Sequence, residues 1–190
     1  NLKILNCFLN PLTSLPVLPS DLRILICDRN KLHALPKLND GLTELYCSHN
    51  YFVDKRMPVL PNSLLHLDCA DCNLNALPEL PHRLLQLCCE YNNLQMLPAE
   101  LPHSLVELWC SHNRLQILPV LPPNLEVLRC NSNLIEILCE LPPALNILWC
   151  DTMRLEMLPQ IPDTLTKLHC EYNPLRQLPN LSRNLIRLYC

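Results

Sequence analysis

The cysteines are the residues with the most obvious potential for chemistry, since the chain of 190 residues contains 13 of them. A cysteine in a regular core position behaves as a small hydrophobic residue. If neighbouring segments stack as strands about 4.8 Å apart, the Cα atoms of equivalent cysteines are close enough for a disulfide. The side chains of equivalent cysteines point in parallel directions, however, and this favours free thiols. Free thiols indicate that the protein works in a reducing compartment. Ten of the cysteines recur at one position of a pattern: Cys7, Cys27, Cys47, Cys69, Cys89, Cys110, Cys130, Cys150, Cys170 and Cys190.

The cysteine motifs do not indicate catalysis. Cys69 and Asp71 form a C-x-D triplet, but Cys69 occupies the recurring core position and no base lies near it in the sequence. Cys88 is expected to face solvent beside Asp68, whose carboxylate would raise the pKa of the thiol, whereas a nucleophile needs a lowered pKa. A zinc site made of Cys88, His66 and Asp68 is an alternative. We predict a protein with no catalytic residues, no metal and no cofactor.

These cysteines belong to a repeat that organises the whole chain. Residues Leu105–Asn124 show its frame, L-x-x-L-x-C-x-x-N-x-L-x-x-L-P-x-L-P-x-x. The leading leucine recurs to give nine full units and a tenth that stops at Cys190. A fixed period is the signature of a solenoid, in which each unit packs on its neighbours. We expect residues 1–190 to form a single array, and to be a fragment that lacks one or both capping units.

Spacing within the unit predicts its secondary structure. Apolar residues at the fourth and sixth positions fit a strand with one face inward, and successive units can pair such strands only in parallel. Asparagine stands at the ninth position in seven of nine units, where its amide can bond backbone groups as the chain leaves the strand. Cys72 and Met153 are the exceptions, and Met153 should mark a weak point because a thioether has no donor.

The prolines predict the return path of each unit. Pairs three residues apart, such as Pro119 and Pro122, match polyproline II and forbid a helix. The expected fold is therefore a solenoid of about ten repeats, with a parallel β-sheet on its concave face, an extended polyproline II convex side and no regular helices.

Composition argues against several partners. The net charge of −3 leaves no basic stripe for nucleic acid. Proline or polar residues interrupt every apolar run well before the length of a membrane-spanning helix. We expect neither nucleic acid nor a membrane as a partner.

The twenty-residue unit with its L-P segments resembles the short leucine-rich repeats of secreted bacterial effectors, the YopM-like and IpaH-like families. The resemblance covers the whole chain, which looks like a cysteine-bearing variant, since these families usually have an aliphatic residue at the sixth position. It implies a leucine-rich-repeat solenoid that is secreted into a host cell and binds host proteins in the reducing host cytosol. The bacterial cytoplasm is the alternative location. The ubiquitin-ligase activity of the IpaH-like enzymes is not implied, because it resides in a separate helical domain.

Outward-facing strand positions supply the candidate binding site. The fifth position holds Trp109 and Trp149 with Arg129 on the intervening strand, so the guanidinium can stack on both rings. Tryptophan, tyrosine and arginine dominate binding hot spots. The strand segments of units three to six carry five carboxylates and no lysine or arginine, which favours a partner with a basic surface. The candidate partner-binding residues are Tyr46, Asp68, Glu90, Glu107, Trp109, Arg129, Trp149, His169 and Tyr189.

We therefore predict a non-catalytic module that binds a protein partner through its concave face. One alternative is the substrate-recognition half of a ubiquitin ligase whose catalytic domain lies outside these residues. Another is a structural solenoid that self-associates through unpaired strand edges at uncapped ends.

Overall fold

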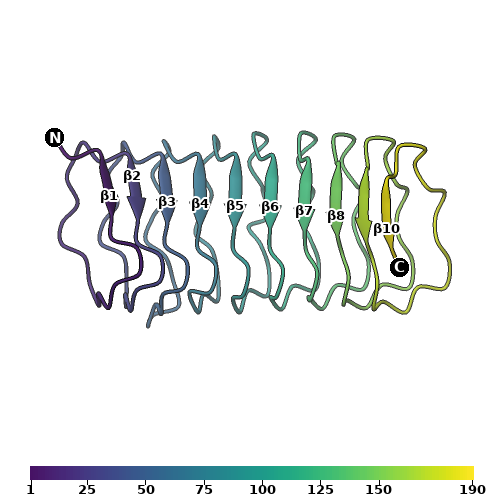
Figure 1. The fold of residues 1–190 in the computed structure, drawn as a ribbon, viewed down its shortest axis with the longest axis horizontal. Helices are drawn as coiled ribbons and strands as arrows, with labels where there is room; N and C mark the ends of the chain where they lie inside the picture. The colour runs from purple at the N-terminus through teal and green to yellow at the C-terminus, as the bar shows by residue number, and fades with distance from the viewer.

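The computed structural model describes all 190 residues and contains ten parallel strands and no helix. The strands follow one another through a single sheet in the order of the sequence, so the chain winds as a solenoid (Figure 1). The predicted fold class is confirmed. Each strand is three residues long: β1 Ile4–Asn6, β2 Ile24–Ile26, β3 Glu44–Tyr46, β4 His66–Asp68, β5 Gln86–Cys88, β6 Glu107–Trp109, β7 Val127–Arg129, β8 Ile147–Trp149, β9 Lys167–His169 and β10 Arg187–Tyr189.

The middle residue of each strand faces the core. Leu108 and its neighbours Leu128 and Leu148 are fully buried, whereas the residues on either side of them in β6, β7 and β8 are half-buried on the outer face. Alternation of this kind is what a strand with one buried face requires. The buried leucines and cysteines form one apolar cluster that runs through all the coils.

Strand register places equivalent positions of successive units side by side. Trp109 pairs with Arg129, and Arg129 pairs with Trp149. The ladder continues beyond the strands, because the backbone N–H of each core cysteine donates to the fifth-position carbonyl of the next unit, as from Cys110 to Arg129 at 2.8 Å. Register is therefore fixed at each step by backbone bonds on both sides of the fifth residue.

Asparagine side chains close the turn after each strand. The Nδ2 of Asn113 donates to the carbonyls of Cys89, Cys110 and Ser111, and its Oδ1 accepts the N–H of Leu94. Backbone groups that leave the ladder here would otherwise be buried without partners. The same set of bonds recurs at Asn30, Asn50, Asn92, Asn133 and Asn173.

The two exceptions behave differently. The thiol of Cys72 takes over the donor role and lies 3.0 Å from the carbonyl of Cys47, while the carbonyl of Cys72 accepts the N–H of Phe52 at 3.3 Å. Met153 has no polar atom to offer, and the bond that would reach the N–H of Ile135 is missing. The missing hydrogen bond is the structural basis for the weak point that the sequence predicts at Met153.

A left-handed residue precedes each ninth position. The φ angle lies between 50° and 56° at all nine of these residues, and none of them is glycine: Leu9, Arg29, His49, Asp71, Tyr91, His112, Ser132, Thr152 and Tyr172. Left-handed backbone is costly for residues with a Cβ atom, so the surrounding bonds must hold it in place. Backbone bonds to the next unit supply that restraint, as from the N–H of Thr152 to the carbonyl of Glu171 at 2.9 Å, and the conformation persists before Met153, where no asparagine is present.

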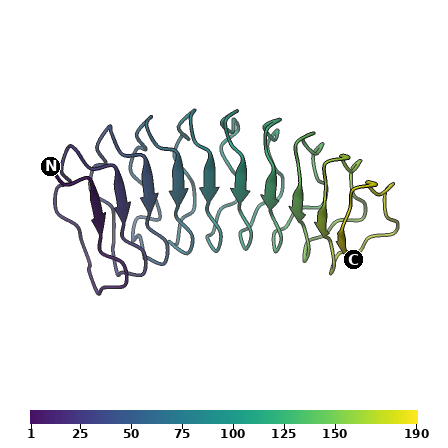
Figure 2. The same ribbon diagram turned by 45° about the horizontal axis from the view of Figure 1, so that its top comes forward.

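The return side of each coil is extended and has no helix. A tight turn leads back to the sheet, in which the N–H of the leading leucine donates to the carbonyl three residues earlier, as from Leu105 to Pro102 at 3.0 Å. The turn persists where the proline is absent, since Leu42 makes the same bond to Asn39 at 3.1 Å. Figure 2 shows the coils following a shallow arc. No helix long and apolar enough to cross a membrane is present.

Candidate functional site

Five side chains at the fifth strand position form one continuous stack across β6 to β10. We call this set the aromatic strip: Trp109, Arg129, Trp149, His169 and Tyr189. The Cζ of Arg129 lies 4.4 Å from the ring centre of Trp109 and 4.6 Å from that of Trp149. The ring centre of His169 lies 4.5 Å from Trp149 and 4.3 Å from Tyr189. The predicted stacking of Arg129 on both tryptophans is confirmed.

The charge in the aromatic strip is not neutralised within the chain. Arg129 takes part in none of the four ion pairs of the structure. Its Nε and the Nε1 of Trp109 are shielded from solvent and have no hydrogen-bond partner. Each cation–π contact is worth about 0.5–1 kcal/mol at a partly exposed site. The strip therefore presents flat apolar surface around a guanidinium that no carboxylate opposes.

The stack stops at Trp109, because the fifth position holds smaller groups on the two strands before it, β5 and β4. Cys88 and Asp68 occupy this position on β5 and β4, and Tyr46 occupies it on β3. The hydroxyl of Tyr46 donates to Glu44 at 3.1 Å. Burial, followed by this bond to Glu44, raises the pKa of Tyr46 to about 12.

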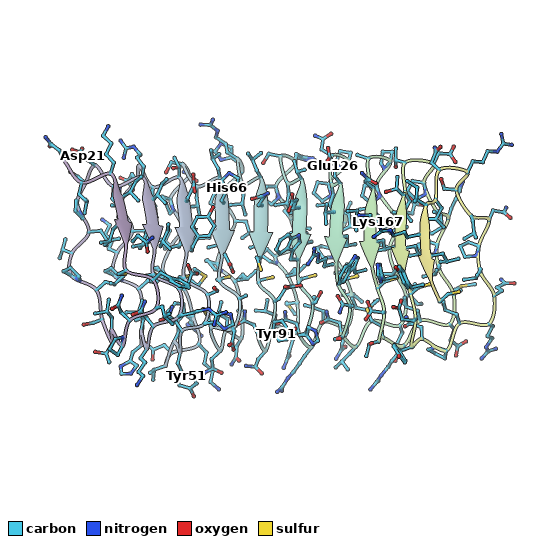
Figure 3. All side chains as sticks on the ribbon, in the orientation of Figure 1. Asp21, Tyr51, His66, Tyr91, Glu126 and Lys167 are labelled. Atoms are coloured by element: carbon cyan, nitrogen blue, oxygen red, sulfur yellow. The ribbon has the colours of Figure 1, made fainter.

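Short side chains between two aromatic residues leave a hollow in the outer face of the sheet. Its volume is about 140 Å³, and the sequence did not predict it. The only signal in the sequence was the small size of Asp68 and Cys88 between Tyr46 and Trp109. Figure 3 labels His66, which lies on β4 at this part of the sheet. The side chains that line the hollow include Tyr46, His66, Asp68, Gln86, Cys88, Glu107 and Trp109.

The carboxylates near the hollow are also unpaired. Asp68 accepts the backbone N–H of Ala70 at 3.0 Å, but neither Asp68, Glu90 nor Glu107 takes part in an ion pair. Burial raises the pKa of Asp68, and the bond from Ala70 partly opposes this effect. The hollow with its carboxylates and the aromatic strip with its guanidinium therefore meet at Trp109.

The residues of the alternative zinc site, His66, Asp68 and Cys88, all line the hollow, but they are not arranged as ligands for one metal ion. No group of three or more histidine, cysteine, aspartate and glutamate side chains is arranged to hold a metal ion. His66 instead contacts Gln86, with 2.7 Å between Nδ1 and Oε1. Burial and the neighbouring carboxylate of Asp68 raise the pKa of Cys88, as the sequence indicates. This environment stabilises the thiol over the thiolate that a nucleophile or a metal ligand requires.

Eight of the ten recurring cysteines are buried in the core, as expected, and the other two belong to the first and last units. Cys69 has no exposed surface, and burial raises its pKa well above the usual value, which removes the C-x-D triplet as a candidate nucleophile. All thirteen cysteines are free thiols, Cys7 is half-buried and Cys190 is exposed. The sulfur atoms, drawn in yellow, form a row beside the strands in Figure 3.

The structure thus places eight of the nine predicted binding residues in two neighbouring groups. Trp109, Arg129, Trp149, His169 and Tyr189 form the strip. Tyr46, Asp68 and Glu107 line the hollow with Trp109, while Glu90 lies just beyond the end of β5 and does not line it. His169 also approaches Glu171, with 3.7 Å between Nδ1 and Oε1.

Short parallel strands, a twenty-residue coil and a leucine-lined core define the class of this molecule: it is a leucine-rich-repeat solenoid of the short type. No protein-family model and no curated protein matches the chain. Among solved structures it is similar to YopM from Yersinia enterocolitica, with 35% identity and a TM-score of 0.82 over 99% of this chain and 46% of that one. It is also similar to YopM from Yersinia pestis, described as a leucine-rich effector protein, with 34% identity and a TM-score of 0.85 over 99% of this chain and 59% of that one.

Two further bacterial structures share the fold. A Shigella effector leucine-rich-repeat domain is 28% identical, with a TM-score of 0.60 over 92% of this chain and 71% of that one. The functional domain of InlJ from Listeria monocytogenes, described as including a cysteine ladder, is 26% identical, with a TM-score of 0.69 over 93% of this chain and 45% of that one. The resemblance to effector repeats is confirmed, and the chain spans about half the length of the YopM structures.

Proposed function

We propose that this chain is a recognition module that holds a partner protein on its concave sheet face. In this proposal it serves as the host-target-binding domain of a secreted bacterial effector and works in the reducing host cytosol. Support for secretion comes from its likeness to YopM, a leucine-rich effector protein. Free thiols throughout the core suit a reducing compartment.

The aromatic strip is the observation that carries the proposal. A stack of rings on the outer face of the sheet, around an unpaired guanidinium, has no role in the core, which the leucines and cysteines fill from the opposite face. Residues of these types, when a partner desolvates them fully, supply most of the energy of a protein interface. The adjacent carboxylates would select for partners with basic groups and speed their encounter.

Replacing Trp109 and Trp149 with alanine tests this function. The double variant should lose at least about tenfold in capture of a partner crosslinked from host-cell lysate, because hot-spot aromatics contribute about 2 kcal/mol or more each. The matched control is Ile117→Ala with Ile137→Ala, which removes two side chains that are 69% and 76% exposed on the return side. Equal urea midpoints should show that both variants are folded. Full capture by the tryptophan variant, or loss of capture by the control, would place the site elsewhere.

A further inference from the structure

The hollow between Tyr46 and Trp109 has the size of a single side chain. Its volume of about 140 Å³ is below the roughly 300–1,000 Å³ of a small-molecule site. Two aromatic side chains wall it along the row of strands, and the shorter Asp68 and Cys88 form its floor. The geometry is that of a socket for one residue of a partner that lies across the sheet.

The negative charge of its lining indicates which residue of a partner the hollow accepts. Asp68 and Glu107 both line it, no lysine or arginine does, and neither carboxylate has an ion-pair partner in the chain. The apolar part of the lining that faces outward comes from the rings of Tyr46 and Trp109, since the side chains of Leu67 and Leu87 point into the core beneath it. An apolar wall with carboxylates suits a cation carried on an aliphatic stem, because such a side chain buries its methylenes while its charged end pairs.

A metal ion does not fit the same place. The histidine, cysteine and carboxylate groups here are not arranged as three or more ligands for one ion. Burial also keeps the Cys88 thiol protonated by raising its pKa. The unpaired carboxylates therefore suit an organic cation with several spread donors, as in a guanidinium or ammonium group.

We infer that this hollow receives one lysine or arginine side chain of the partner protein, with Asp68 and Glu107 as its counter-charges. The inference rests on the proposed function, since it assumes that the partner lies on the sheet face. It adds a specificity determinant: the aromatic strip supplies contact area, and the hollow requires a basic residue at one place beside it.

Selection from a random octapeptide library displayed on phage, with the wild-type chain as bait, tests the inference. Enriched peptides should contain lysine or arginine. They should bind the Asp68→Asn, Glu107→Gln variant at least about tenfold more weakly, as expected when one member of a desolvated charge pair is removed. The matched control is Glu126→Gln with Glu140→Gln, which changes the net charge equally at two exposed carboxylates and should bind within about twofold of wild type.

Stability separates a lost contact from a lost fold. Burial raises the pKa of Asp68, so its ionisation opposes folding at neutral pH, and Asn at this position should not lower the urea midpoint. Enrichment of peptides without basic residues, no enrichment at all, or equal binding to wild type and the hollow variant would each overturn the inference.

The outcomes also distinguish the two proposals. If the tryptophan variant loses partner capture while the selected peptides ignore Asp68 and Glu107, the concave face is the site and the hollow is not a basic-residue socket. If peptides need both carboxylates but the natural partner is captured without the tryptophans, the hollow accepts basic residues and the aromatic strip does not carry the proposed function.

Discussion

Single residues at the ninth position stabilise this fold by pairing buried backbone groups of two units. Asn113 bonds three carbonyls and one N–H from two units, and each buried polar group left unpaired costs about 1–3 kcal/mol. Cys72 replaces one of these hydrogen bonds with a bond from its thiol to the carbonyl of Cys47, whereas the side chain of Met153 replaces none of them. The residue before the ninth position is left-handed in every unit, including those of Cys72 and Met153, which the sequence did not reveal because no glycine stands there.

Met153→Asn should stabilise the array. The new amide would donate to the carbonyls of Cys130 and Cys150 and accept the N–H of Ile135, as its equivalents do in other units. Net gains of about 1 kcal/mol per hydrogen bond, less the lost burial of the thioether, predict a rise of about 1–2 kcal/mol in the free energy of unfolding.

Urea unfolding measures this change, and Met153→Leu is the control because it keeps the apolar character and adds no polar group. Leucine should leave the midpoint nearly unchanged. A midpoint for the asparagine variant at or below that of wild type would show that the missing hydrogen bond costs the fold nothing.

At the scale of the element, each coil is a three-residue strand joined to an extended return segment. The sequence predicted this accurately because leucine, cysteine and asparagine hold their spacing and prolines exclude helix from the return path. It also predicted the Trp109–Arg129–Trp149 contact, since a constant period fixes which side chains are neighbours. The extension through His169 and Tyr189, and the hollow beside Tyr46, depend on side-chain shape and orientation, which spacing alone does not determine.

The buried thiols predict how the coils respond to alkali and to thiol reagents. Burial raises the pKa of the core cysteines, including Cys110 and Cys130, so the unfolded chain loses thiol protons at lower pH than the native chain does. A native state that holds more protons loses stability as pH rises, and the decline should begin near pH 8.5, about the pKa of a free thiol.

Labelling with a chromogenic disulfide at pH 8 checks the same burial. Nine of the thirteen thiols are buried and should react only when the chain unfolds. At most four thiols should therefore react in the native protein, and the exposed Cys190 should react fastest. Rapid native labelling of more than four, or stability that does not change between pH 8 and 10, would contradict a core lined by protonated thiols.

At the scale of the whole molecule, the repeat places the outer-face side chains of successive units in one long row, along which their charge and size change. Stability in such an array is approximately a sum over units and their interfaces, so the outer face can vary while the inner face stays constant. Here that variation places an acidic hollow on β3 to β6 and the aromatic strip on β6 to β10, meeting at Trp109. The arrangement suits a partner that lies along the sheet with both basic and apolar groups.

Hydroxyl-radical footprinting of the chain with its captured partner tests most directly whether the concave sheet is the binding face. Tryptophan and methionine both oxidise readily, and the chain carries Trp109 and Trp149 on the sheet but exposed Met96 and Met157 on the return side. We predict strong protection of the two tryptophans and unchanged oxidation of the two methionines. Protection of the methionines with the tryptophans still accessible would contradict the account.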